Sequence, residues 1–323
     1  MYPILFSIGD SPVRAYGLLL AVALILGWVL SLRLAKADKL PADVLGTAYV
    51  VAVAGGLLVA RAMWLFQSGD FDPVKLIEFQ AGGFSGFGGL LAGTIIAAAY
   101  AQSRKVPPWA WLDAAAPAFL IGVVIERSAA FMAGADFGHY VDPSFFLGVQ
   151  FPADSPVHAV QRAQLSGLRV PADMSLPVHP SQLYAAACAA VGVVGCFLVR
   201  ARRQYSGQVA LFAFAFYGVV RYLIEDPFRY DSTPDIGGPV TLGQITAVVI
   251  VGLVAVAHFA RLRELAQDPK AVRQWLGGPW TPGWDDGKKS KKKTKGKKGS
   301  KKSSKTAPKK AAKPSSKTAP KGD

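Results

Sequence analysis

Three residues with helical spacing are the first candidates for chemistry. Tyr217, Arg221 and Glu225 follow one another at steps of four, in and just after the apolar stretch 209–224. Because such steps advance only about 40° around a helix, the three side chains would share one stripe. The carboxylate would pair with the guanidinium and aim it at an anion, while the tyrosine hydroxyl donates a hydrogen bond. A purely structural ion pair is the alternative.

Two further arginines and one histidine belong to the same set of candidates. Arg127 stands where the apolar stretch 109–125 ends, and a guanidinium there would bind a phosphate or only reach the membrane interface. Arg61 lies late in another apolar stretch, where it would bind a phosphate or pair with a carboxylate. Because charge at membrane depth is costly, such residues usually mark function. His179 precedes the apolar stretch 183–199 and is the nearest candidate for a base.

Membrane helices are the elements that must position these residues. The chain of 323 residues is 51% hydrophobic and 18% charged, whereas soluble domains carry about 25% charged residues. Seven stretches approach the roughly 20 apolar residues needed to cross a bilayer. They are 16–34, 45–66, 82–101, 109–125, 183–199, 209–224 and 240–260. We therefore predict an all-α polytopic membrane protein with seven transmembrane helices.

The distribution of Lys and Arg predicts the orientation. The connections after the first, third, fifth and seventh stretches are rich in basic residues, and the others are poorer. By the positive-inside rule the N-terminus lies outside and the C-terminus in the cytoplasm. The long connection 126–180, between spans four and five, is then on the outer side. Its segment 157–168 is weakly amphipathic, which fits either a surface-lying helix or an ordinary loop.

The net charge of +15 belongs to the C-terminal tail. Residues 288–323 contain 16 Lys and one Asp, so the rest of the chain sums to zero and we expect no specific nucleic-acid partner. The tail is predicted to be disordered and to attract anionic lipids of the cytoplasmic leaflet. Ribosome or nucleic-acid binding, or no function at all, are its alternatives. No residue spacing typical of a metal site occurs, and neither metal nor cofactor is expected.

Several motifs, in a single order along the chain, resemble those of the bacterial prolipoprotein diacylglyceryl transferases. The most specific is the H-P-S-Q-L-Y run at 179–184. The family signature G-R-x-G-N-F-x-N-G-E-x-x-G is matched in part, by Arg127, Phe131, Gly134 and Gly138. The stretch from Tyr217 to Glu225 is the third match. The resemblance covers about 1–265, which we expect to be the membrane domain, followed by a linker at 266–287 and the tail at 288–323.

The resemblance implies a multi-pass transferase of the bacterial cytoplasmic (inner) membrane. It would move the diacylglyceryl group of phosphatidylglycerol to the lipobox cysteine beside a prolipoprotein signal peptide, forming a thioether and releasing glycerol phosphate. Arg127 and Arg221 would hold the phosphate, and Glu225 would orient Arg221. Tyr16 and Tyr217 would donate hydrogen bonds. Arg61 and Gly138 complete the expected lipid site, and His179 as the base for the thiol is an additional hypothesis.

The chain departs from the family pattern at several positions. Alanine replaces two asparagines and a glutamate of the arginine signature, Glu126 replaces a glycine, and a polar residue in the third stretch is a phenylalanine. These positions are Ala130, Ala133, Ala135, Glu126 and Phe87. Asp136, next to the lost glutamate, would be its substitute. The departures leave open a non-catalytic or altered-specificity lipid-binding paralogue of the same fold.

Overall fold

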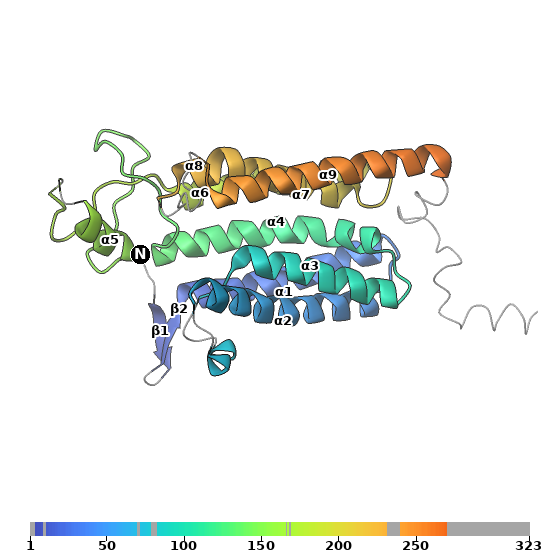
Figure 1. Cartoon of the computed structure of the whole chain (residues 1–323), viewed down its shortest axis with the longest axis horizontal. Helices are drawn as coiled ribbons and strands as arrows, with labels where there is room; N and C mark the ends of the chain where they lie inside the picture. The colour runs from blue at the N-terminus through green and yellow to red at the C-terminus, as the bar shows by residue number, and fades with distance from the viewer. Residues whose placement is uncertain are drawn as a thin grey trace, which may run out of the picture. The chain divides into compact units, whose positions relative to one another are not determined.

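The computed structural model describes residues 4–8, 11–69, 72–78, 83–165, 167, 169–230 and 240–269. Nearly all of the expected linker 266–287 and the whole of the expected tail 288–323 lie outside these residues. The chain is mostly helical (Figure 1).

A short hairpin precedes the helices. It is formed by the antiparallel strands β1 (Ile4–Ile8) and β2 (Ser11–Arg14). The long helices are α1 (Ala15–Ala37), α2 (Ala42–Gln67), α3 (Gly86–Ser103), α4 (Pro108–Ala133), α6 (Ser181–Arg202), α7 (Gln208–Val220) and α9 (Leu242–Gln267). The short ones are η1 (Pro73–Leu76), α5 (Pro156–Gln164), the π turn η3 (Arg221–Glu225) and α8 (Asp226–Phe228). In the amphipathic segment of the long connection, the structure therefore favours a helix, α5.

Six helical segments of the described chain are long and apolar enough to cross a membrane. They are α1, α2, α4, α6, α9 and the continuous segment Gln208–Phe228. Large apolar side chains point outward from them, for example Ile25, Val191 and Val256, which are 61%, 64% and 69% exposed. Such faces are unfavourable in water and favourable in lipid. The chain is thus a multi-pass membrane protein, whereas a seventh span at α3 stays a prediction.

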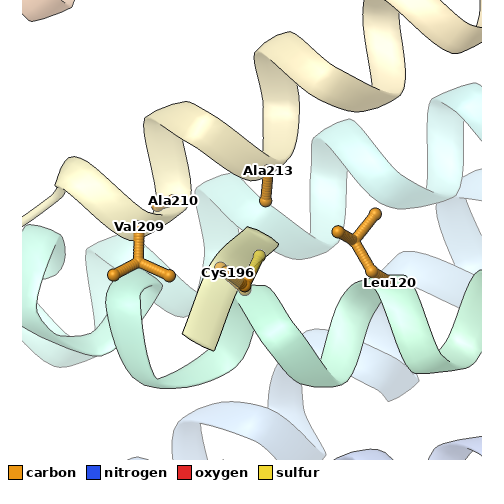
Figure 2. Packing of buried hydrophobic residues seen from close by; sticks show 6 residues of the cluster. Leu120, Cys196, Val209, Ala210 and Ala213 are labelled. Atoms are coloured by element: carbon orange, nitrogen blue, oxygen red, sulfur yellow. The ribbon is translucent and has the colours of Figure 1, made fainter. Parts of the chain in front are cut away.

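Helix α4 lies at the centre of the helix packing, since it contacts α1, α3, α6 and α7. α1 packs on α4, α2 on α3, α6 on α4 and α7, and α9 on α7 (Figure 1). α2 and α3 approach closely because glycines face each other: a Cβ added to Gly56 would lie 2.9 Å from the Gly89 carbonyl oxygen. Between α4, α6 and α7 the core consists mostly of small side chains around Leu120, Cys196 and Val209 (Figure 2). The small side chains let these helices, which carry the candidate residues, pack closely.

At the first turns of α4 a buried carboxylate fixes the start of another helix. Asp113 accepts hydrogen bonds from the backbone amides of Gly207, Val209 and Ala210, at 2.8–3.0 Å. These are the unpaired amides that begin α7. The carboxylate therefore caps α7 and not the helix that carries it. This contact locks α4 to α7 at the end opposite Arg127.

Candidate functional site

The end of α4 turns the chain back over its own last turns. Gly134 ends the helix in the left-handed region, with φ 68°, and the amides of Gly134 and Ala135 bond to the carbonyls of Phe131 and Ala130. Asp136 then also has a positive φ of 55°, which is uncommon for a residue with a side chain. This tight reversal brings the Asp136 carboxylate to the guanidinium of Arg127.

A π turn shapes the second half of the site. Between α7 and α8 the amide of Asp226 bonds to the carbonyl of Arg221, five residues earlier. A turn closed by a bond over five residues is wider than an α-helical turn. The residues four and five positions after Arg221 therefore both lie beside its side chain. Arg221 consequently contacts Glu225 at 3.1 Å and Asp226 at 3.5 Å. The ion pair predicted from the four-residue spacing is confirmed, and Asp226 is added to it.

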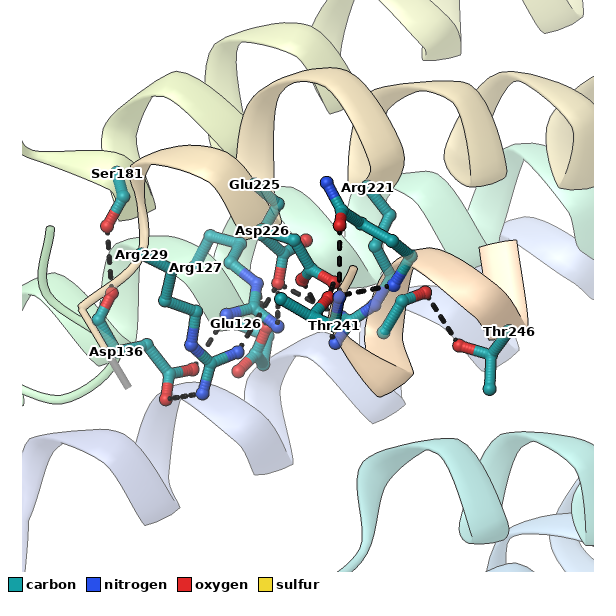
Figure 3. A network of polar contacts seen from close by, with 12 residues as sticks. Glu126, Arg127, Asp136, Ser181, Arg221, Glu225, Asp226, Arg229, Thr241 and Thr246 are labelled. Atoms are coloured by element: carbon teal, nitrogen blue, oxygen red, sulfur yellow. Dashed lines mark hydrogen bonds and ion pairs between the residues drawn. The ribbon is translucent and has the colours of Figure 1, made fainter. Parts of the chain in front are cut away.

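Arg127 is surrounded by three carboxylates (Figure 3). Its Nε lies 3.0 Å from Glu126, its Nη1 2.7 Å from Asp136 and its Nη2 3.1 Å from Glu225. The Arg127 side chain is only 11% exposed. Burying a guanidinium is costly unless it is paired, and here each of its three nitrogens faces an acid. The arrangement holds the guanidinium plane in one orientation.

Glu225 is the centre of the site. Its Oε1 lies 3.1 Å from Arg127, 3.1 Å from Arg221 and 3.6 Å from Arg229. The Glu225 side chain is 3% exposed, so these pairs are formed out of water. One buried carboxylate oxygen therefore gathers guanidinium groups from α4, from the π turn and from the residue that follows α8.

Asp136 and Asp226 complete the cluster, with Asp136 at one end and Asp226 beside Glu225 (Figure 3). Asp136 contacts Arg229 at 2.6 Å in addition to Arg127, and Asp226 accepts a hydrogen bond from the Thr241 hydroxyl at 2.7 Å. Below, the guanidinium–carboxylate cluster means Arg127, Arg221, Arg229, Glu126, Asp136, Glu225 and Asp226. It contains three guanidinium groups and four carboxylates. Such a site can neutralise and orient an anionic group once one of its carboxylates has moved away from the arginines.

Both predicted tyrosines lie at the cluster. The hydroxyl of Tyr16, in the first turn of α1, donates a hydrogen bond to Glu126 at 3.2 Å. Tyr217 packs edge-on against Phe119, with ring centres 5.4 Å apart. A cavity of about 10 Å³ is lined by Tyr217 and Glu225 together with apolar side chains of α4, α6 and α7. The structure thus brings Tyr16, Arg127, Tyr217, Arg221 and Glu225 together.

His179 lies beside the cluster but its ring has other neighbours. Its Nδ1 is 3.2 Å from the hydroxyl of Tyr184, and its ring packs edge-on against Phe145 and Phe228 at 5.0 and 4.9 Å. Partial burial, and then the neighbouring His139, lower the pKa of His179 below its usual value. The imidazole is therefore neutral at pH 7, which is the form that can accept a proton.

The segment after His179 anchors the loop that carries Asp136. Ser181 donates a hydrogen bond to the Asp136 carbonyl at 2.9 Å, and Gln182 donates one to the Ala135 carbonyl at 2.6 Å. Helix α6 begins at Ser181, directly after Pro180. The H-P-S-Q-L-Y run is thus a clamp on the end of α4 as well as the start of a helix.

Gly138 lies where two segments cross. Its amide bonds to the His179 carbonyl at 3.0 Å, and an added Cβ would lie 2.6 Å from the His179 Cβ and 2.8 Å from the Phe228 carbonyl oxygen. Any side chain here would push the segments apart. Gly138 thus lets the segments of His179 and Phe228 lie close together.

Arg61 has partners away from the cluster. Its buried guanidinium donates hydrogen bonds to the carbonyls of Lys75 and Gly83 at 2.9 and 3.0 Å and lies over the rings of Trp64 and Phe84. These contacts tie the loop between α2 and α3 to the end of α2. None of the contacts described for Arg61 joins it to Arg127 or Arg221.

Sequence reasoning missed Arg229 and underrated Glu126 and Asp136 as members of the site. Their one local signal is position, since Glu126 adjoins Arg127 and Arg229 follows Glu225 by four residues. Of the alanine departures, Ala130 is fully buried and Ala135 gives its carbonyl to Gln182. The side chain of Phe87 lies outside the described residues. Within the described ranges, no three His, Cys, Asp or Glu residues gather in a way that could hold a metal ion.

Comparison with known proteins gives a consistent family. The sequence model of the family described as prolipoprotein diacylglyceryl transferase matches residues 3–260. A phosphatidylglycerol–prolipoprotein diacylglyceryl transferase of Lysinibacillus sphaericus (strain C3-41) is 28% identical over 261 residues, which cover 79% of this chain and 91% of the relative. One of Halalkalibacterium halodurans is 26% identical over 300 residues, covering 91% and 96%.

Proposed function

The chain belongs to the prolipoprotein diacylglyceryl transferase family, and we propose that the guanidinium–carboxylate cluster is where it performs that reaction. It is a membrane transferase that uses phosphatidylglycerol and a prolipoprotein. The diacylglyceryl group passes to the lipobox cysteine, a carbon–sulfur bond replaces the carbon–oxygen bond to the phosphate, and glycerol phosphate leaves. The observation that supports the site is the convergence of Arg127, Arg221 and Arg229 on one buried carboxylate.

The leaving phosphate is the group that most needs the protein. Negative charge grows on its oxygen as the carbon–oxygen bond breaks, and guanidinium donors already fixed in place stabilise that charge without reorganising. Arg127 and Arg221 would provide this, with Glu225 holding both in position. Tyr16 and Tyr217 would donate hydrogen bonds to the donor lipid. Gly138 and Arg61 would act by keeping the surrounding loops in place.

The acceptor thiol must lose its proton before it can attack, because the thiolate is the nucleophile. His179 is the base we propose, since its lowered pKa keeps the imidazole neutral at pH 7. It adjoins the segment that clamps Asp136, so the same stretch of chain would serve both halves of the reaction. The proton would move from the cysteine sulfur to an imidazole nitrogen.

The membrane arrangement is part of the proposal. We propose that α3, whose 18 residues span about 27 Å as a helix, is a seventh crossing. The N-terminus would lie outside and the C-terminus in the cytoplasm of a bacterial cell, with the connection between α4 and α6 on the outer side of the cytoplasmic membrane. The cluster at the end of α4 would then face the outer leaflet. Basic residues after α1, α3, α6 and α9 support this orientation.

The C-terminal segment has a separate proposed role. We propose that residues 1–265 are the transferase domain, 266–287 a linker and 288–323 a cytoplasmic tail that binds anionic lipids. Its 16 lysines support this, at about 1 kcal/mol for each basic residue near the membrane surface. A chain cut after Gly287 should keep its transferase activity, and loss of activity would show that the tail takes part in catalysis.

Complementation tests the site. The full chain should restore prolipoprotein processing in a bacterium depleted of its own transferase. Arg127→Ala and Arg221→Ala should abolish the rescue, while Arg263→Ala, at an exposed arginine near the end of α9, should keep it. Rescue by the first two variants would overturn the proposed site. A well-expressed wild-type chain that does not rescue would favour the lipid-binding paralogue instead.

A further inference from the structure

The carboxylate of Asp136 is held in the way an anionic ligand would be held. Its Oδ2 lies 2.7 Å from Nη1 of Arg127, and its Oδ1 lies 2.6 Å from Nη2 of Arg229. These are short distances for charge-assisted hydrogen bonds. Each oxygen thus faces a different guanidinium, one from α4 and one from the segment after α8. Figure 3 shows this bridge at one end of the cluster.

Asp136 is also at the accessible edge of the cluster. Its side chain is 24% exposed, whereas those of Glu225 and Asp226 are 3% and 1% exposed. Glu126 has similar exposure, but it contacts one guanidinium, that of Arg127, and accepts the hydroxyl of Tyr16. Among the acids of the cluster, Asp136 is therefore the one that both bridges two arginines and can be reached from outside.

The backbone of Asp136 is fixed while its carboxylate can turn away. Its carbonyl accepts the Ser181 hydroxyl at 2.9 Å, and the preceding carbonyl accepts Gln182. The side-chain contacts described for Asp136 are the two guanidiniums alone. A rotation about its side-chain bonds would release both arginines without moving the loop.

We propose that Asp136 occupies the place that the phosphate of the donor lipid takes, and that binding of the lipid displaces it. This inference rests on the proposed function of the cluster. A phosphate, like a carboxylate, offers two oxygens that can bridge two guanidiniums. The charge balance requires displacement, because with all groups ionised the acids already exceed the guanidiniums by one. Adding a phosphate beside Asp136 would leave two excess negative charges in a partly buried site.

The proposal makes Arg229 a phosphate ligand and Asp136 an internal competitor. The competing carboxylate would weaken lipid binding, and its return would help to expel the glycerol phosphate product. Asp136 would then set the affinity for the anionic group of the substrate. A residue that only positioned Arg127 would have the opposite effect, since its removal would weaken binding.

The test compares Asp136→Asn with two variants that remove the same charge elsewhere. Asp142→Asn lies in the same connection, where its carboxylate contacts only Ser144 among the described residues. Glu126→Gln removes an acid that contacts Arg127 without bridging to Arg229. Full-length protein in phosphatidylcholine nanodiscs is titrated with phosphatidylglycerol, and transfer to a lipobox peptide gives the half-saturating lipid fraction. Binding of inorganic phosphate is measured separately by thermal shift, which does not depend on turnover.

We expect Asp136→Asn to lower the half-saturating lipid fraction about fivefold or more and to tighten phosphate binding by a similar factor. Asp142→Asn should match the wild type, and Glu126→Gln should change both values less. Unchanged or weaker phosphate binding in Asp136→Asn overturns the proposal, as does an equal gain in Glu126→Gln. If Asp136→Asn does not fold, Asp136→Ser replaces it with the same expectation. If the wild type shows no transfer, that result contradicts the proposed function. The phosphate-binding measurement then still tests this inference on its own.

Discussion

Replacing Glu225 by glutamine tests whether one buried carboxylate organises the cluster. Its Oε1 faces Arg127 and Arg221 at 3.1 Å and Arg229 at 3.6 Å, and its side chain is 3% exposed. Removing one partner of a buried ion pair costs about 3–5 kcal/mol, because the charges left behind are uncompensated. Glutamine keeps one acceptor oxygen, so we expect a loss near the lower end, about 3 kcal/mol of unfolding free energy.

The assay is thermal unfolding of the purified chain in one detergent at one scan rate. A loss of about 3 kcal/mol should lower the midpoint by roughly 4–6 °C for a protein of this size. Glu264→Gln is the matched control, since Glu264 pairs with Arg261 in α9 but is 53% exposed. Exposed pairs contribute about 0–1 kcal/mol, so this midpoint should hardly move.

Two results would refute the reasoning. Equal midpoints for Glu225→Gln and Glu264→Gln would mean that the buried contacts around Glu225 do not stabilise the fold. If Glu225→Gln shows the expected drop in midpoint but the half-saturating fraction of phosphatidylglycerol is unchanged, the arginines bind lipid without being held by Glu225. Glu225→Asp distinguishes the effect of the charge from the effect of side-chain length, because it keeps the carboxylate and shortens the side chain.

Three further predictions follow from single contacts. Asp113→Asn should lose about 2 kcal/mol in thermal unfolding, because its carboxylate accepts three amides at the start of α7. Gly138→Ala should cost about 1–3 kcal/mol and reduce transfer, since its Cβ would lie 2.8 Å from the Phe228 carbonyl oxygen; activity equal to wild type would contradict this. Because the pKa of His179 is lowered, kcat/KM should stay constant as pH falls through about 6.5 and decline only below it; His179→Gln should remove that decline.

The local half of the site could be predicted from the sequence. Spacing alone places Arg221 and Glu225 on one stripe, and they form an ion pair at 3.1 Å. The Pro-Ser pair predicts the start of α6 at Ser181, and the Thr-x-x-Gln pattern at Thr241 caps α9. These features depend on neighbours within one or two helical turns. Physical rules for isolated helices therefore suffice for them.

The contacts between distant segments could not be predicted in the same way. Arg229 meets Asp136 across 93 positions of sequence, and Tyr16 meets Glu126 across 110. The first contact depends on how the chain reverses after Gly134 and on the extra residue in the π turn, and the second depends on the packing of α1 on α4. A one-residue change in either turn would redirect Asp136 or Arg229, and no periodicity in the sequence indicates these contacts.

The departures from the family pattern acquire a physical meaning in this cluster. The chain has alanine at 130, 133 and 135, and it has acids at Glu126 and Asp136. Ala130 is fully buried, and its side chain carries no polar atom that could bond to Arg127. The two acids instead hold Arg127 from two sides, at 3.0 and 2.7 Å. Arg127 thus has ionic contacts in a chain that lacks the two asparagines of the family pattern. A cluster held by charge should be more sensitive to competing anions than one held by neutral hydrogen bonds. Inhibition of transfer by inorganic phosphate should therefore weaken as ionic strength rises, because salt screens the partly exposed edge at Asp136.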